Sequence, residues 1–243
     1  MEDQLEEDKI RKWALAWEPR TKLVAVILFI FGVISLTTIP TTVTAYLFSL
    51  LMILLMGISI TLVLKRYLII LPFLLLMTIP LLFSTGLTVS NENLTFAILI
   101  LLKAFTAMTV ISILLDTQTM EQFMRSLAGL RVHPIIITVL MHSYRYVFLF
   151  LDDIQKMQIA AKSRLFKGGI SIRNLKIFGQ LIGALLIRSV DRSERVYKAM
   201  TSRSFDGRLR VRPTSTITSL DYLKTSFMLM MIFLLIFAEN WVG

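Results

Sequence analysis

The amino-acid sequence predicts an all-α, polytopic membrane protein with about five transmembrane helices and a cytoplasmic unit of long helices. Of its 243 residues, 56% are hydrophobic, and the mean hydropathy is +0.73. Several apolar runs approach the length of about 20 residues that a helix needs to cross a bilayer. This composition excludes an ordinary soluble domain.

The positive charge is concentrated in one segment. The formal net charge is +10, and residues 116–219 hold 17 Lys and Arg against 7 Asp and Glu, which by subtraction accounts for all of it. By the positive-inside rule, this segment is expected in the cytoplasm of a protein in the cell membrane. Because the cations follow apolar spans, membrane lipids are expected partners and nucleic acid is not.

Residues 1–22 are predicted to be a cytoplasmic or interfacial segment. They contain six acidic and five basic side chains, which is not the composition of a cleavable signal peptide. Trp13 and Trp17 lie one helical turn apart and favour a short helix in the membrane interface. A solvated, frayed terminus is the alternative.

Residues 23–115 are predicted to form a four-helix transmembrane part, with spans at 23–39, 42–64, 67–83 and 94–115. Pro40 is expected to end the first span, and Lys65 and Arg66 to separate the second from the third. Pro72 and Pro80 predict kinks in the third span.

The rest of the membrane topology follows from the loops. Residues 84–93 contain no Lys or Arg and indicate an external loop. Residues 220–243 are predicted to hold the last transmembrane helix.

Lys103 falls near the middle of the fourth span. A charged side chain at that depth costs at least about 2.5 kcal/mol unless it faces a partner or water. The first four spans contain no acidic residue, so Lys103 is a possible contact with another subunit. Packing against Thr106 or Ser112 of the same bundle is the alternative.

Residues 116–219 are predicted to form the cytoplasmic part. Thr119 and Gln122 indicate a capping box that opens an amphipathic helix, and His133-Pro134 ends it. Residues 134–151 are long enough to span a membrane. Crossing would carry the following cations outside, so this stretch is expected to be cytoplasmic or half-sunk.

A nine-residue pattern, A-x-x-S-R-x-F-x-G, occurs twice, 39 residues apart. Its fixed positions are Ala160, Ser163, Arg164, Phe166 and Gly168 in the first copy, and Ala199, Ser202, Arg203, Phe205 and Gly207 in the second. Each copy ends an apolar, helix-permissive run, and its glycine suits the left-handed residue that stops a helix. We call these two copies the arginine tips. As ordinary last-turn cations, their arginines would contribute only about 0.3 to 1 kcal/mol each.

Gly179 and Gly183 form a small-x-x-x-small pair between the two arginine tips. Such a pair lets two helix backbones approach closely. We expect it where the two tip-bearing helices cross.

Several kinds of chemistry are missing from the sequence. The G-x-x-x-x-G-K-[ST] pattern of a P-loop is absent, so ATP hydrolysis by that route is excluded. Two histidines without metal-ligand spacing, and no cysteine, predict no metal site made by this chain alone. Asp152 and Asp153 are adjacent on a helix and do not converge as an acid and base would. The chain is therefore expected not to be an enzyme.

The sequence resembles the transmembrane T component of energy-coupling factor (ECF) transporters, and within it the cobalt-type CbiQ branch. The resembling stretches are residues 18–23, 144–146 with 152–153, the first arginine tip, 188–189, 194–197, and 199–200 with 205–207.

The resemblance implies a non-catalytic subunit that couples two ABC-type ATPase subunits to a substrate-binding membrane (S) subunit. It assigns ATP and Mg²⁺ to the ATPases and no cofactor to this chain. It also implies that Arg164 and Arg203 dock the ATPases and that the cargo is cobalt. Leu165 and Ser204 stand where the family usually has glycine, which puts the helix-end geometry in question.

Three alternatives remain open at this point. The T component could serve nickel or biotin transport. The chain could be a self-sufficient channel or secondary carrier with Lys103 lining its pathway. A membrane-embedded enzyme is the third, although no acids, histidines or thiols converge.

Overall fold

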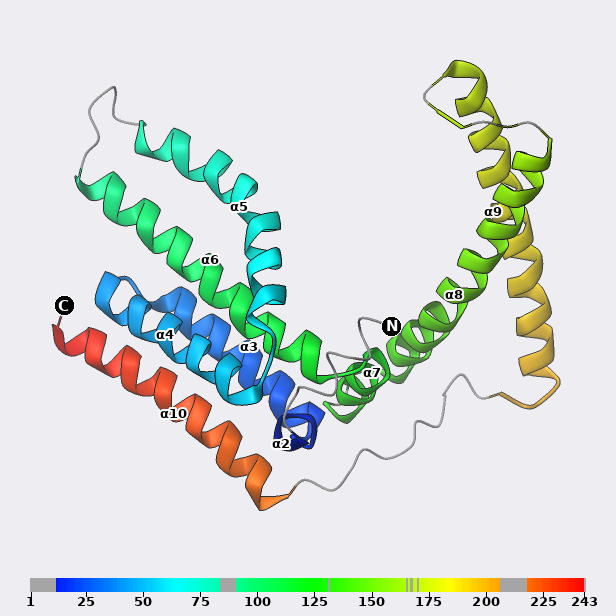
Figure 1. The fold of residues 1–243 in the computed structure, drawn as a ribbon. Helices are drawn as coiled ribbons and strands as arrows, with labels where there is room; N and C mark the ends of the chain where they lie inside the picture. Colours follow the sequence, from blue (N-terminus) through cyan, green and yellow to red (C-terminus); the bar gives the residue numbers. More distant parts are fainter. Residues whose placement is uncertain are drawn as a thin grey trace. The chain divides into compact units, whose positions relative to one another are not determined.

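The computed structural model describes residues 12–83, 91–130, 132–164, 166, 168–169, 171–205 and 218–242, and within these ranges the regular structure is nine α-helices (Figure 1). The all-α prediction is confirmed. The chain divides into unit 1, Met1–Gly129 with Pro213–Gly243, and unit 2, Leu130–Arg212. The predicted boundary at residue 116 falls inside unit 1, as do residues 213–219.

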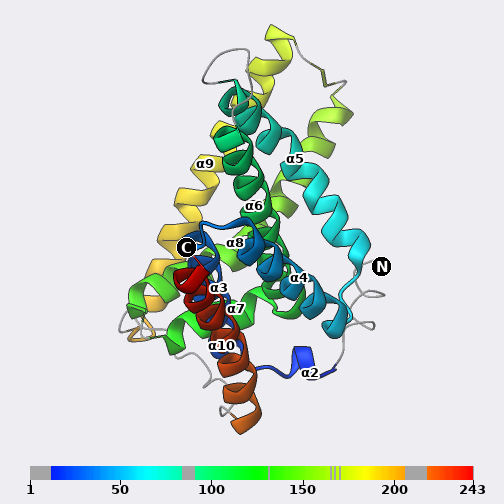
Figure 2. The same ribbon diagram turned by 90° about the vertical axis from the view of Figure 1, so that its left-hand side faces the viewer.

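Unit 1 contains seven of the described helices. They are α2 (Lys12–Leu15), α3 (Pro19–Ser35), α4 (Ile39–Met56), α5 (Ile60–Leu82), α6 (Asn91–Thr117), α7 (Met120–Gly129) and α10 (Ser219–Val242). Figures 1 and 2 show α3, α4, α6 and α10 side by side, with α5 against α6. α3 is central because it packs against α6, α7 and α10.

The core of unit 1 lies around α3. The Phe29 ring is fully buried and stacks on Phe48 of α4 with the ring centres 5.9 Å apart. Phe48 in turn packs on Phe227 of α10, also at 5.9 Å. A Cβ on Gly32 would lie 2.2 Å from Ile232 Cγ1, so glycine permits the close approach of α3 and α10.

The first helix boundary differs from the prediction. Pro40 does not end the first span, because α3 stops at Ser35 and Pro40 lies in the first turn of α4. A proline there lacks only an N–H that has no partner within the helix. Only Leu36, Thr37 and Thr38 separate the two helices.

The second boundary also differs. α4 ends at Met56 because Gly57 adopts the left-handed conformation, with φ of 76°. Lys65 and Arg66 consequently lie inside α5, so their predicted position between two spans is wrong. Arg66 Nη1 donates to Asp116 Oδ2 of α6 at 2.8 Å.

α5 contains both prolines predicted to kink it, Pro72 and Pro80. Figure 1 shows the helix changing direction part-way along its length, as expected where a proline removes a backbone bond. Of the predicted external loop 84–93, residues 84–90 lie outside the described residues and Asn91 already begins α6.

Five helices in the described part of the chain are long and apolar enough to cross a membrane: α4, α5, α6, Pro134–Ser163 and Ser219–Glu239. The chain is a membrane protein. The sequence predicted a span at residues 23–39, most of which lie in α3, and placed residues 134–151 in the cytoplasm or half-sunk in the membrane. α3 has 17 residues, and a helix of that length reaches only about 25 Å. The cytoplasmic position of residues 116–219 stays a prediction.

Unit 2 is a hairpin of two 30-residue helices, α8 (Pro134–Ser163) and α9 (Ile172–Thr201) (Figure 1). His133 precedes α8 as its cap and Pro134 starts it, as the predicted break requires. A small apolar hollow between the helices is lined by Ile154, Met157, Phe178, Leu181, Ile182 and Leu185. The four apolar side chains of α9 among them therefore face α8.

Candidate functional site

The first arginine tip follows the end of α8 at Ser163. The amides of Arg164 and Phe166 both donate to the carbonyl of Ala161, at 3.0 and 3.1 Å. The Phe166 ring meets Phe178 of α9 edge to face at 5.2 Å. Phe166, the aromatic residue of the pattern, thus holds the segment that follows α8 against α9.

The second arginine tip closes α9 with the same two bonds, since the amides of Arg203 and Phe205 donate to Met200 at 3.0 and 3.1 Å. Met200 corresponds to Ala161 at the 39-residue offset of the pattern. Ser204 has φ of 54° and its amide donates to Thr201 at 3.0 Å. These bonds define a Schellman motif with Ser204 at its left-handed position.

The glycine of the first copy, Gly168, does not stop α8. Gly168 has φ of 73° but lies in the loop well after Ser163, where its carbonyl accepts a bond from Asn174 Nδ2. In each tip the bond to the phenylalanine amide closes the helix before the glycine is reached. The prediction is therefore wrong for Gly168. Gly207 lies outside the described residues.

The two tip arginines are presented in the same way. Arg164 and Arg203 are exposed, and neither guanidinium has a hydrogen bond or ion pair with any described residue. Ser163 and Ser202 turn their hydroxyls back to helix carbonyls, Ile159 and Lys198, at 3.0 Å each. Ala160 and Ala199 are exposed beside them. Each tip therefore offers an unbonded guanidinium at a helix end.

An ion pair joins the two tip-bearing helices. Arg192 Nη2 of α9 donates to Asp153 Oδ2 of α8 at 2.7 Å, and the guanidinium lies over the Phe150 ring at 5.6 Å. Asp153 therefore links the helices and is not simply solvated. Gly179 and Gly183 have nothing within 4 Å of an added Cβ. The prediction that α8 and α9 cross at this glycine pair is wrong.

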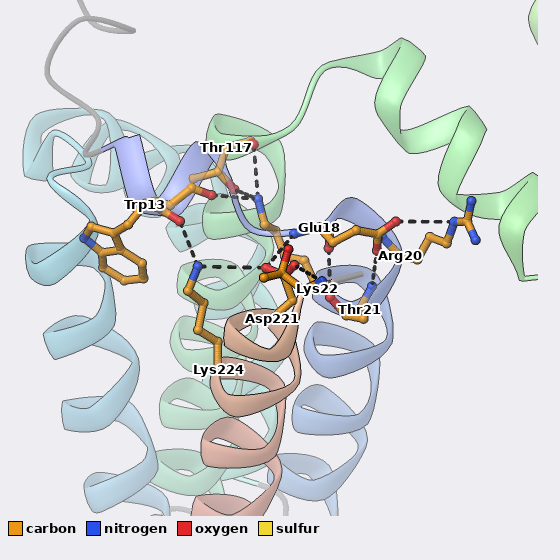
Figure 3. Close-up of polar contacts among 10 residues, drawn as sticks. Trp13, Glu18, Arg20, Thr21, Lys22, Thr117, Asp221 and Lys224 are labelled. Atoms are coloured by element: carbon orange, nitrogen blue, oxygen red, sulfur yellow. Dashed lines mark hydrogen bonds and ion pairs between the residues drawn. The ribbon is translucent and has the colours of Figure 1, made fainter. Parts of the chain in front are cut away.

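A second group of functional interest lies in unit 1, where the ends of α3, α6 and α10 meet (Figure 3). We call it the polar cluster and define it as Glu18, Lys22, Thr117, Asp221 and Lys224. Lys22 is completely buried, and its Nζ donates to Ala14 O, Thr117 O and Thr117 Oγ1 at 3.0, 3.2 and 3.0 Å. All three ammonium donors are thereby used.

Glu18 and Asp221 cap two helices and contact each other's segments. Glu18 Oε2 accepts from the Arg20 and Thr21 amides at 2.8 and 3.2 Å, which caps α3. Asp221 accepts from the Thr218 amide at 3.0 Å and from the Glu18 amide at 3.2 Å. Figure 3 shows the Glu18 carboxylate turned toward Arg20 and Thr21, and the Asp221 carboxylate turned toward Lys224 and the Glu18 amide.

Two further contacts extend the polar cluster. Lys224 Nζ donates to Trp13 O at 3.1 Å and ties α10 to α2. Trp17, predicted to lie in an interfacial helix, follows α2 and is buried.

At the end of α7, a Cβ on Gly129 would lie 2.2 Å from Arg20 Nε. α7 begins with the predicted capping box, Thr119 N to Gln122 Oε1 at 3.1 Å and the reciprocal bond at 3.3 Å.

Lys103 has a hydrogen-bond partner within its own chain. Its Nζ donates to the Ile34 carbonyl at the end of α3, at 2.8 Å. Glu239 of α10 interacts electrostatically with Lys103 and accepts bonds from the Thr37 hydroxyl and Thr38 amide, at 2.7 and 2.9 Å. Glu239 lies in α10, outside the four spans whose lack of acidic residues left Lys103 without an expected partner.

Neither sequence-based account of Lys103 describes these contacts. The hydroxyls proposed as alternative partners bond to their own helix, Thr106 to Leu102 and Ser112 to Met108.

No group of three or more His, Asp or Glu side chains among the described residues could hold a metal ion.

Comparison with known proteins identifies the family. Residues 11–214 match the family CbiQ, described as cobalt transport protein. The chain belongs to the CbiQ family. CbiQ proteins are non-catalytic transmembrane components of transporters, and the match covers both arginine tips. It ends before α10, which supplies Asp221 and Lys224.

Relatives of this CbiQ chain come from archaea and bacteria. It is 26% identical to an uncharacterized protein of Methanocaldococcus jannaschii over 208 residues, 79% of this chain and 71% of the relative. It is 33% identical to the cobalt transport protein CbiQ of Rhodobacter capsulatus over 97 residues, 38% of this chain and 39% of the relative.

Proposed function

We propose that this chain is the coupling (T) component of an ECF-type importer, with one ABC-type ATPase subunit docked on each arginine tip. The observation that carries the proposal is the duplication of the tips in three dimensions. Two helices end in the same hydrogen-bonded turn, and each turn presents an exposed, unbonded arginine. Two equivalent sites suit two equivalent partners. ATP and Mg²⁺ would bind those partners, and this chain would bind no cofactor.

Arginine suits such a docking site. Its planar fork can bond a carboxylate with two parallel donors, which the ammonium of lysine cannot reproduce. The ion pair between Arg192 and Asp153 holds α8 and α9 together. In this proposal the hairpin moves as one lever and passes the closure of the ATPases to a substrate-binding membrane subunit.

Cobalt is the proposed cargo. The support is the description of the family and the name of the Rhodobacter capsulatus relative, cobalt transport protein CbiQ. Nickel and biotin importers are the alternatives within the same class of function. Uptake of labelled cobalt by cells that express the whole complex, with nickel and biotin as competitors, tests the assignment.

Removing both tip arginines should release the ATPases. The Arg164→Ala, Arg203→Ala double variant is expected to weaken each contact by about 2 to 5 kcal/mol, because the partner's charge is left unmatched. Pull-down of the ATPases from mild detergent measures the loss. Lysine at both positions should restore binding only in part.

The matched control removes two positive charges that neighbour the tip arginines. Lys162→Ala with Lys198→Ala takes one exposed cation from the last turn of each tip-bearing helix and leaves the arginines in place. ATPase binding should persist in this control. Normal ATPase pull-down and ATP-dependent uptake by the double arginine variant would show that the tips are only helix caps.

The proposal places the amino terminus and residues 116–219 in the cytoplasm. The sequence has no cysteine, so single cysteines can report sidedness without background. A cysteine at Thr88 should react with an impermeant reagent from outside, and one at Ser171 only after permeabilisation. Labelling of both from outside would contradict the topology.

A further inference from the structure

A hollow of about 450 Å³ lies at the end of unit 1 that holds the polar cluster. Trp13 and Trp17 line it together with Lys224, and we call it the tryptophan hollow. The rest of its wall comes from the end of α4 and the first half of α10, including Met52, Leu55, Met56, Phe227 and Met230. It is distinct from the arginine tips, which belong to unit 2.

We propose that the tryptophan hollow binds an acyl chain of an anionic phospholipid, with the headgroup at Lys224. Its wall is almost entirely apolar, so water would find few hydrogen-bond partners there. Leu223, Phe227 and Met230 are 68%, 52% and 59% exposed. On a membrane protein, exposed apolar side chains between two spans face lipid, so an acyl chain matches this wall.

The depth of the tryptophan hollow fits a lipid headgroup at one end. Met56 is the last residue of α4, and Leu223 lies near the start of α10. Both helices are long and apolar enough to cross the membrane, so the hollow lies near a membrane surface. Tryptophan and lysine are favoured at that level because each combines an apolar body with a polar end.

One tryptophan in the wall of the hollow has a buried donor without an acceptor among the described residues. Trp17 is only 2% exposed, and its buried Nε1–H has no acceptor among the described residues. A buried donor without a partner is unfavourable. The ester and phosphate oxygens of a phospholipid are acceptors of the required kind.

The charges at this end favour an anion. Arg20 pairs with Glu18 and Lys224 with Asp221, and Lys22 adds the one net positive charge among these residues. Lys22 is buried and fully bonded, but Lys224 keeps part of its side chain exposed. Lys224 Nζ lies 3.9 Å from Asp221 Oδ1, beyond hydrogen-bond distance, so its single hydrogen bond, to Trp13 O, leaves ammonium donors available.

Quenching of tryptophan fluorescence tests the site in the full-length chain. The sequence has three tryptophans, so Trp13→Phe with Trp241→Phe leaves Trp17 as the single fluorophore. The protein is reconstituted into vesicles of phosphatidylglycerol or phosphatidylcholine brominated on the acyl chains. Trp17 should be quenched by both lipids, with phosphatidylglycerol associating about fivefold more strongly.

Two lysine variants separate the headgroup site from general surface charge. Lys224→Gln should bring the two lipids close to equal association. Lys65→Gln removes an exposed cation of α5 and should leave the preference unchanged. Equal association in the parent protein overturns the headgroup assignment, and absence of quenching by either lipid overturns the acyl-chain site. The readout needs no ATPase, so it is independent of the coupling proposal.

Discussion

The polar cluster in unit 1 and the arginine tips in unit 2 use charged side chains in opposite ways. Lys22 is fully buried, and all its donors are bonded within the chain. Arg164 and Arg203 are exposed and have no partner among the described residues. The first arrangement holds helices together, and the second leaves charge available to another protein. Substitutions in the polar cluster should therefore change folding, and those in the tips should change assembly.

The largest effect on folding is expected at Lys22. Lys22→Ala removes three charge-assisted bonds and leaves the Thr117 and Ala14 carbonyls buried without a donor. Hydrogen bonds to charged groups are worth about 1.5 to 3 kcal/mol, so we expect a loss of about 3 kcal/mol in the free energy of unfolding. Thermal unfolding in detergent measures it.

The same measurement on tip variants sharpens the comparison. The Arg164→Ala, Arg203→Ala double variant should unfold like the parent protein, with less than about 1 kcal/mol lost per residue. Lys65→Ala, at an exposed position of α5, supplies a control for charge removal in unit 1. If the tip variant unfolds as easily as Lys22→Ala, the proposed division between the two regions is wrong.

A smaller effect is expected at Glu239, which joins α10 to the connection between α3 and α4. Glu239→Ala leaves the Thr37 and Thr38 amides without their acceptor and should lower the free energy of unfolding by about 2 kcal/mol. Glu239→Gln keeps an acceptor oxygen and should lose less. Glu194→Ala, which breaks only an exposed pair with Lys198, is the control.

A Glu239→Ala variant also tests the carrier alternative for Lys103. Lys103 would keep its bond to the Ile34 carbonyl and lose only its neighbouring carboxylate. In a coupling component, ATP-dependent uptake should then fall only in proportion to folded protein. Transport of solute by this chain alone in vesicles would favour the carrier.

The sequence was most informative where structure depends on neighbouring residues. The apolar runs predicted the long helices, and Thr119 with Gln122 predicted the cap of α7. The boundary between the second and third spans was predicted at the charged pair Lys65 and Arg66. The structure places it at Gly57, whose left-handed conformation ends α4. The charged pair and the glycine are both visible in the sequence, so the glycine could have predicted the correct end of α4.

The polar cluster could not be predicted in the same way. Glu18 and Asp221 are separated by 203 positions, and Lys22 and Thr117 by 95. No periodicity relates such pairs, because their meeting depends on how α3, α6 and α10 pack. The tips could be predicted because the same pattern occurs twice, although Gly168 does not take the helix-stopping position expected of it.

The smallest predicted effect concerns that turn. Ser204 occupies a left-handed position, with φ of 54°, where a side chain is disfavoured by about 1 to 2 kcal/mol. Ser204→Gly should relieve this strain and stabilise the end of α9 by about 1 kcal/mol. Ser202 has ordinary helical angles, φ of −66° and ψ of −16°. Ser202→Gly should therefore destabilise the same turn.

Hydrogen exchange at the Phe205 amide reports on this turn directly, because that amide closes it onto Met200. Exchange should slow in Ser204→Gly and quicken in Ser202→Gly. Equal acceleration in both variants would mean that Ser204 carries no backbone strain. If the exchange rate falls in Ser204→Gly and rises in Ser202→Gly, glycine suits position 204 because of its left-handed backbone conformation. The arginine next to it would then be held by a turn that serine closes less well than glycine.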